Sequence, residues 1–79
     1  MVIEQRAVRF EQWGRNLASI RKLNGYPSQR AFARALGVSK SAVQFWESGA
    51  VPPRDEMKAR IAGLLNVEVR TLFPIEPVK

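Results

Sequence analysis

The stretch that decides the fold runs from Ser28 to Gly49 and reads SQRAFARALGVSKSAVQFWESG. Apolar residues recur in it at the three- and four-residue spacing of a helix, in two runs separated by Gly37-Val38-Ser39. Gly37 can adopt the positive φ that a sharp corner after the first run requires, because glycine has no Cβ. The stretch therefore predicts two short helices joined by a tight turn.

The first of these helices is predicted over residues 29–36, with Ser28 as its N-cap. Helical spacing puts Phe32, Ala33 and Leu36 on one face, which we expect to be buried. Ala33 is small, as the contact between two helices at a tight corner requires.

The second helix is predicted over residues 40–48, with Ser39 as its N-cap. Val43 and Trp46 lie three residues apart and are expected to face the core. The outer face then carries Lys40, Ser41, Gln44 and Phe45.

Three further helices are expected around this pair, so the predicted fold is all-α with five helices. One precedes the pair, over about residues 8–23, and Gly14 is a weak point in its pattern. Two follow it, over about residues 55–65 and 68–73, and Pro74 ends the last of them.

Composition excludes several classes of protein. The chain has 79 residues, which is enough for one domain, and it contains no cysteine and no histidine. Disulfides, thiolate metal sites and histidine-based catalysis are therefore not available, and we expect no enzyme activity, metal or cofactor. No apolar run approaches the roughly 20 residues of a membrane span, and the first ten residues do not resemble a secretory signal. We therefore expect a cytoplasmic protein.

Charge indicates the partner. Thirteen basic residues against seven acidic ones leave a net charge of +6. Such an excess on a small domain favours a polyanion, either nucleic acid or an anionic membrane surface, although solubility alone would also explain it. A membrane surface is disfavoured, because no predicted helix pairs a broad apolar face with a lysine-rich one.

Ordered motifs through nearly the whole chain carry a family resemblance. They are Ser28-Gln29, Phe32-Ala33, Leu36-Gly37-Val38-Ser39, Val43, Trp46-Glu47 with Gly49, Pro53, Ile61-Ala62, Leu65-Asn66-Val67 and Leu72-Phe73. Together they resemble the Cro/C1-type (Xre-family) helix-turn-helix domain of the lambda-repressor-like fold. The resemblance implies a DNA-binding domain over residues 8–73, an N-terminal extension over residues 1–7 and a C-terminal tail over residues 74–79.

The resemblance also implies roles for individual residues. The helix over residues 40–48 would enter the major groove of DNA and read bases with Lys40, Ser41, Gln44 and Phe45. Phosphate contacts would come from Ser28, Gln29, Arg30, Arg34 and Ser39. Structural roles would fall to an Arg21–Glu47 ion pair and to Ala33, Gly37 and Trp46.

Three of these roles have alternatives that the sequence leaves open. Lys40 could be an ordinary solvated lysine. Phe45 could belong to the core, because it is large and adjacent to Trp46. Arg30 and Arg34 could serve solubility alone.

A transcriptional repressor that binds a palindromic operator as a homodimer is the function that the resemblance favours. The protein would be encoded by a bacterium or phage and associated with the nucleoid when bound to DNA. The same fold also serves in antitoxins that bind a toxin protein and their own promoter, and in controllers of restriction–modification systems. For the dimer surface we expect the C-terminal end, with Val69, Leu72, Phe73 and Ile75. Val2, Ile3 and Val8 are the competing set.

Overall fold

Five helices make up the regular structure of the computed structural model, which describes the backbone of residues 2–75 and the side chains of residues 10–75. They are α1 (Val2–Leu23), α2 (Gln29–Leu36), α3 (Lys40–Ser48), α4 (Asp55–Leu65) and α5 (Val69–Leu72). No strand occurs in the described range, so the predicted all-α architecture is confirmed. None of these helices is long and apolar enough to cross a membrane.

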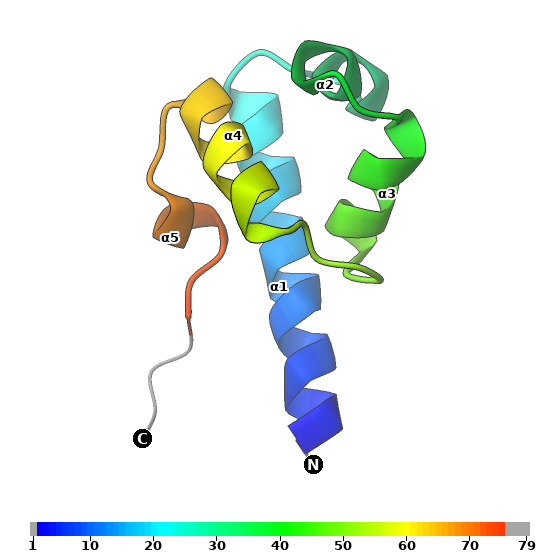
Figure 1. The fold of residues 1–79 in the computed structure, drawn as a ribbon, viewed down its shortest axis with the longest axis vertical. Helices are drawn as coiled ribbons and strands as arrows, with labels where there is room; N and C mark the ends of the chain where they lie inside the picture. Colours follow the sequence, from blue (N-terminus) through cyan, green and yellow to red (C-terminus); the bar gives the residue numbers. More distant parts are fainter. Residues whose placement is uncertain (1, 76–79) are drawn as a thin grey trace.

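The helices pack around the C-terminal half of α1, and its first turns extend beyond the others (Figure 1). α1 begins at Val2, six residues before the predicted start. The prediction relied on apolar periodicity, which becomes clear only from Phe10 onward, whereas nothing in the preceding residues breaks a helix.

Local chemistry explains why α2 and α3 begin and end where they do. The Oγ atom of Ser28 accepts a hydrogen bond from the backbone N–H of Ala31 at 3.0 Å, so Ser28 caps α2 as predicted. Ser39 caps α3 in the same way, through the N–H of Ala42 at 3.1 Å. Gly37 ends α2 with a φ of 77°, a left-handed conformation that allows the chain to turn directly into α3.

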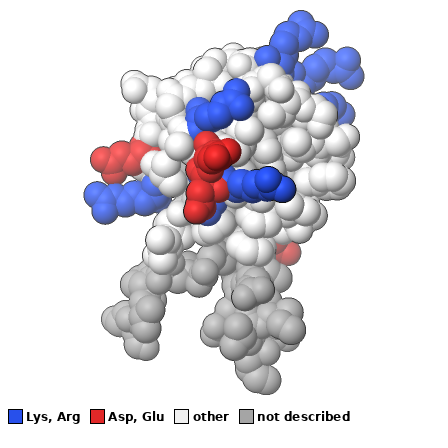
Figure 2. Space-filling view, in the orientation of Figure 1, with Lys and Arg blue, Asp and Glu red and all other residues white. Residues whose placement is uncertain are grey.

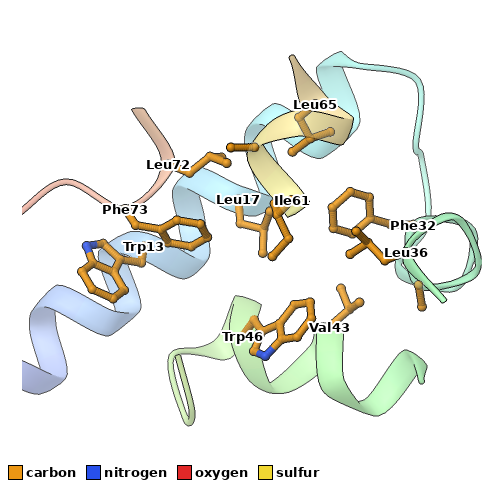
Figure 3. Packing of buried hydrophobic residues seen from close by; sticks show 12 residues of the cluster. Trp13, Leu17, Phe32, Leu36, Val43, Trp46, Ile61, Leu65, Leu72 and Phe73 are labelled. Carbon is orange, nitrogen blue, oxygen red and sulfur yellow. The ribbon is translucent and has the colours of Figure 1, made fainter. Parts of the chain in front are cut away.

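One hydrophobic core joins all five helices (Figure 3). Leu17 and Ile61 lie at the centre of this view, between Phe73 and Phe32, and Phe32, Leu36 and Val43 close the end formed by α2 and α3. The inner faces predicted for α2 and α3 are confirmed. The buried members of the core are Trp13, Leu17, Phe32, Ala33, Leu36, Val43, Trp46, Ile61, Ala62, Leu65, Leu72 and Phe73.

α1 and α3 approach each other more closely than side chains would normally allow. A Cβ atom at Gly14 would lie 2.6 Å from the carbonyl carbon of Glu47 and 2.8 Å from the carbonyl oxygen of Trp46. A Cβ atom at Gly49 would lie 2.8 Å from the Cα atom of Glu11. Gly14 is therefore more than a weak point of α1, because its missing side chain allows the backbones of α1 and α3 to come into contact.

The expectation for the C-terminal end is wrong in part. Leu72 and Phe73 are 0% and 3% exposed, so they belong to the core and cannot supply a free apolar surface. The indole Nε1 of Trp13 donates to the carbonyl oxygen of Pro74 at 2.9 Å, which holds the end of this segment against α1. Only Val69 and Ile75 of the predicted set remain exposed.

The competing set for the dimer surface, Val2, Ile3 and Val8, lies outside the described side chains.

Candidate nucleic-acid interface

The outer face of α3 carries the four side chains predicted to read bases. Lys40, Ser41, Gln44 and Phe45 are all exposed. On the opposite face Val43 and Trp46 are 0% and 9% exposed and pack into the core. The four outward side chains therefore form a continuous solvent-facing strip on a helix whose other face is fixed.

Phe45 points outward rather than into the core. Its side chain is 51% exposed, one of the largest apolar exposures among the described residues. The core alternative for Phe45 is thus excluded, because the inner face of α3 is filled by Val43 and Trp46.

Positive charge gathers beside this strip. Arg30 and Arg34 on α2 are exposed, and Lys40 follows in the first turn of α3. Figure 2 shows Lys and Arg side chains projecting over the α2 end of the molecule, whereas the acidic side chains of this view lie lower. Neither α2 nor α3 has an acidic residue in its first turn. No acidic side chain in the first turn of either helix therefore offsets the positive end of its dipole, which favours an anion there.

A buried ion pair links α1 to α3. The Nε atom of Arg21 donates to one carboxylate oxygen of Glu47 at 2.7 Å, and an Nη atom donates to the other at 3.2 Å. The two side chains are only 4% and 7% exposed. The second Nη atom of Arg21 donates to the carbonyl oxygen of Tyr26 at 2.7 Å, in the turn before α2. The predicted Arg21–Glu47 pair is confirmed, and its bidentate geometry fixes α3 against α1.

Gln29 is a third member of this junction, although the sequence predicts a phosphate contact for it instead. Its side-chain Nε2 donates to Glu47 at 2.9 Å. One amide hydrogen of Gln29 is thus used inside the protein, while the second hydrogen remains to be donated. No sequence signal indicated this contact, because a side-chain amide at the start of α2 can donate to a phosphate or to a carboxylate.

The two serines predicted to contact phosphate are engaged as helix caps. The Oγ atoms of Ser28 and Ser39 both accept from their own helices. Each hydroxyl still carries a hydrogen that it can donate, and both residues are exposed. The residues predicted to be structural, Ala33, Gly37 and Trp46, lie at the corner or in the core.

Comparison with known proteins agrees with this geometry. The profile of the helix-turn-helix family matches residues 17–72, a range that contains the Arg21–Glu47 pair, α2, α3 and α4. The uncharacterised HTH-type transcriptional regulator YazB of Bacillus subtilis (strain 168) is 39% identical over 66 residues, which cover 84% of this chain and 94% of that protein. No solved structure gives a significant match. From the tight corner between α2 and α3, the buried ion pair behind α3 and these matches, we conclude that the chain belongs to the Cro/C1-type helix-turn-helix family.

Proposed function

We propose that this protein is a sequence-specific transcriptional regulator, most simply a repressor, that inserts α3 into the major groove of duplex DNA. The observation that carries the proposal is the outer strip of α3, where Lys40, Ser41, Gln44 and Phe45 are all exposed on a helix held rigidly from behind. The nine residues of α3 span about 14 Å, and a helix fits a groove about 12 Å wide.

Each of the polar side chains on the strip has a base edge that it can recognise. Lys40 can donate to O6 and N7 of guanine, and Gln44 can form a paired contact with N6 and N7 of adenine. Ser41 can donate or accept. These contacts would give sequence specificity, because the major groove presents a different pattern of donors and acceptors for each base pair.

Phosphate contacts would set the position of α3 in the groove. Arg30 and Arg34 are exposed beside the strip, and the N-termini of α2 and α3 add backbone N–H groups. The free amide hydrogen of Gln29 would donate to a phosphate oxygen, next to the buried Arg21–Glu47 pair. A dimer that contacts 6–8 phosphates would give a slope of log K against log [salt] of about −5 to −7.

The test begins with selection of bound sequences from random duplex DNA by the purified full-length protein. Binding of variants to the selected duplex and to a scrambled duplex is then measured by fluorescence anisotropy at several salt concentrations. Lys40→Ala and Gln44→Ala are expected to cost about 1–3 kcal/mol on the selected duplex and little on the scrambled one.

Arg30→Ala is the matched control, because it also removes an exposed side chain close to the strip. It is expected to weaken binding to both duplexes by the same factor and to reduce the salt slope by about 2, which is about 1 for each copy of the dimer. Equal losses on both duplexes for all three variants would show that α3 does not read bases.

Pairing of two copies on a two-fold symmetric operator completes the proposal. One recognition helix reaches only a few base pairs, so a dimer with its two α3 helices about 34 Å apart would add affinity and selectivity. The exposed Val69 and Ile75 make the C-terminal end the proposed contact. Sedimentation of the wild type and of the double variant Val69→Glu/Ile75→Glu with the selected duplex tests this contact. If the double variant also binds the duplex as two copies, and as tightly as the wild type, the C-terminal end is not the dimer surface.

A further inference from the structure

The turn between α1 and α2 carries a pair of residues that the proposed function does not use (Figure 1). Asn24 and Gly25 follow the last residue of α1, and both are exposed. Gly25 has a φ of 89°, a left-handed conformation that glycine adopts without strain. An asparagine that precedes a glycine can react with its own backbone, because glycine has no side chain to hinder the approach of the asparagine side chain to the next peptide nitrogen.

The reaction is deamidation, and its co-reactant is water. The backbone nitrogen of Gly25 attacks the Cγ atom of Asn24, and its proton leaves with the side-chain nitrogen as ammonia. The product is a five-membered succinimide ring. Water then opens this ring at either carbonyl carbon. Opening at Cγ leaves an aspartate at position 24, whereas opening at the main-chain carbonyl leaves an isoaspartate, in which the backbone runs through Cγ.

Both reacting groups are accessible in the turn. A Cβ atom built on Gly25 would have no heavy atom of the described residues within 4 Å, apart from its chain neighbours. The backbone N–H of Gly25 donates to the carbonyl oxygen of Lys22 at 3.3 Å, which is longer than a typical N–H···O bond. The side-chain amide of Asn24 donates to the carbonyl oxygen of Ile20 at 2.9 Å on the protein surface, where water competes for it. These two hydrogen bonds oppose the reaction weakly, so the two atoms can approach each other.

Asn66 provides a comparison within the same chain. It is also exposed and also ends a helix in a left-handed conformation, with a φ of 59°. The next residue is Val67, whose β-branched side chain hinders its own nitrogen and packs against the core. The N–H of Val67 donates to a carbonyl oxygen of α4 at 3.0 Å. The third asparagine, Asn16, lies inside α1 and precedes Leu17, which is buried. Of the three asparagines, Asn24 is therefore the one whose surroundings permit the reaction.

The same turn holds the chain in place before α2. The N–H of Tyr26 donates to the carbonyl oxygen of Arg21 at 3.1 Å, and an Nη atom of Arg21 donates to the carbonyl oxygen of Tyr26 at 2.7 Å. An isoaspartate adds one methylene group to the backbone between these two residues, so it changes the spacing that both contacts require. Either product also places a carboxylate four residues before Ser28, the cap of the helix on which Arg30 and Arg34 are exposed.

We propose that Asn24 is a deamidation site and that the acid formed there weakens DNA binding. The second part rests on the proposed function. A negative charge close to the phosphates repels DNA of any sequence, because the phosphate backbone carries no sequence information. The effect should therefore appear on the selected and the scrambled duplex alike.

The modification itself is tested without DNA. The full-length protein is incubated in mildly alkaline buffer, where the Gly25 nitrogen loses its proton more readily, and samples are digested and mapped by mass spectrometry. The peptide that contains residue 24 should acquire the mass of an acid in place of an amide and split into two chromatographic peaks, one for each product. The peptide that contains Asn66 should stay unchanged over the same period. No reaction at Asn24, or equal rates at Asn24 and Asn66, would overturn the site.

Fluorescence anisotropy measures the effect on DNA. The deamidated protein, separated from the unreacted form by ion exchange, should bind both duplexes about three- to tenfold more weakly at low salt, because each dimer carries two additional negative charges. Asn24→Asp, which has the charge on an unaltered backbone, should show a smaller loss than the isoaspartyl protein. Asn24→Gln is the matched control, because it keeps the amide but would need a larger ring to react. After the same incubation it should bind as the fresh wild type does.

Each remaining result decides one part of the proposal. If deamidated and fresh protein bind both duplexes equally, the effect on DNA is wrong and the modification site remains. If incubated Asn24→Gln loses as much affinity as the incubated wild type, the loss comes from another change in the protein, and the effect assigned to residue 24 is wrong. If the fresh protein selects no sequence from random DNA, the proposed function is wrong, whereas the mass measurement still decides whether Asn24 is the site.

Discussion

The buried ion pair behind α3 allows a quantitative prediction. Arg21→Met keeps a long side chain but removes the three donors that reach Glu47 and the carbonyl oxygen of Tyr26. Glu47 would then carry its charge on a side chain that is only 7% exposed. Removing one partner of such a buried pair costs about 3–5 kcal/mol. A domain of this length is stable by about 4–12 kcal/mol in total, so a large part of its stability should be lost.

Urea unfolding at neutral pH, followed by tryptophan fluorescence, measures this loss. The matched control is Arg70→Met, which breaks the Arg70–Glu68 pair, whose side chains are 84% and 72% exposed. Exposed pairs contribute at most about 1 kcal/mol, so the control should remain close to the wild type.

A double variant separates the effect of losing the ion pair from the effect of leaving Glu47 buried and charged without Arg21. Arg21→Met combined with Glu47→Leu replaces both charges by apolar side chains of similar volume, which is often close to neutral for a buried pair. The double variant should therefore be more stable than Arg21→Met alone. The reasoning would be refuted if Arg21→Met cost no more than Arg70→Met, because the pair would then not behave as a buried one.

Glycines provide two more predictions, both measured by urea unfolding. Gly14→Ala should destabilise by about 1–3 kcal/mol, because its Cβ would overlap the backbone of α3. Gly63→Ala, inside α4 with no atom within 4 Å of its Cβ, should instead stabilise by up to about 1 kcal/mol. If both substitutions changed the free energy of unfolding in the same direction, the close approach of α1 and α3 at Gly14 would be contradicted. Gly37→Val should cost about 1–2 kcal/mol because of the φ of 77°, whereas Gly37→Asn should cost less. Equal losses for these two substitutions would argue against backbone strain at the corner.

The parts of the fold that local chemistry determines could be predicted from the sequence. Ser28, Gly37 and Ser39 mark the ends of α2 and α3, and the inner face of each helix follows from its spacing. The family resemblance implied the pair between Arg21 and Glu47, which lie 26 residues apart.

The errors and omissions concern distances between helices, which no local pattern contains. Gly14 looks like a defect in a helix until the α3 backbone is seen beside it. Leu72 and Phe73 follow a pattern that fits a free apolar surface equally well, and only the packed structure shows that both are buried, with the Trp13 ring against that of Phe73. The family resemblance implies a phosphate contact for Gln29, but a side-chain amide can also donate to a carboxylate, and the sequence does not show which partner is nearer.

The backbone contact between α1 and α3 also bears on how such regulators diverge. Gly14 lies against the backbone of α3, and Gly49 lies against the backbone of α1. A larger residue at either position therefore requires the two helices to separate by a fraction of an ångström or more. Such a separation would tilt α3 relative to the corner that presents it to DNA. Relatives with alanine or serine at the position of Gly14 are therefore expected to dock on DNA at a different angle even when their base-contacting residues are identical. Exchanging only those residues between two such proteins should then transfer sequence preference incompletely.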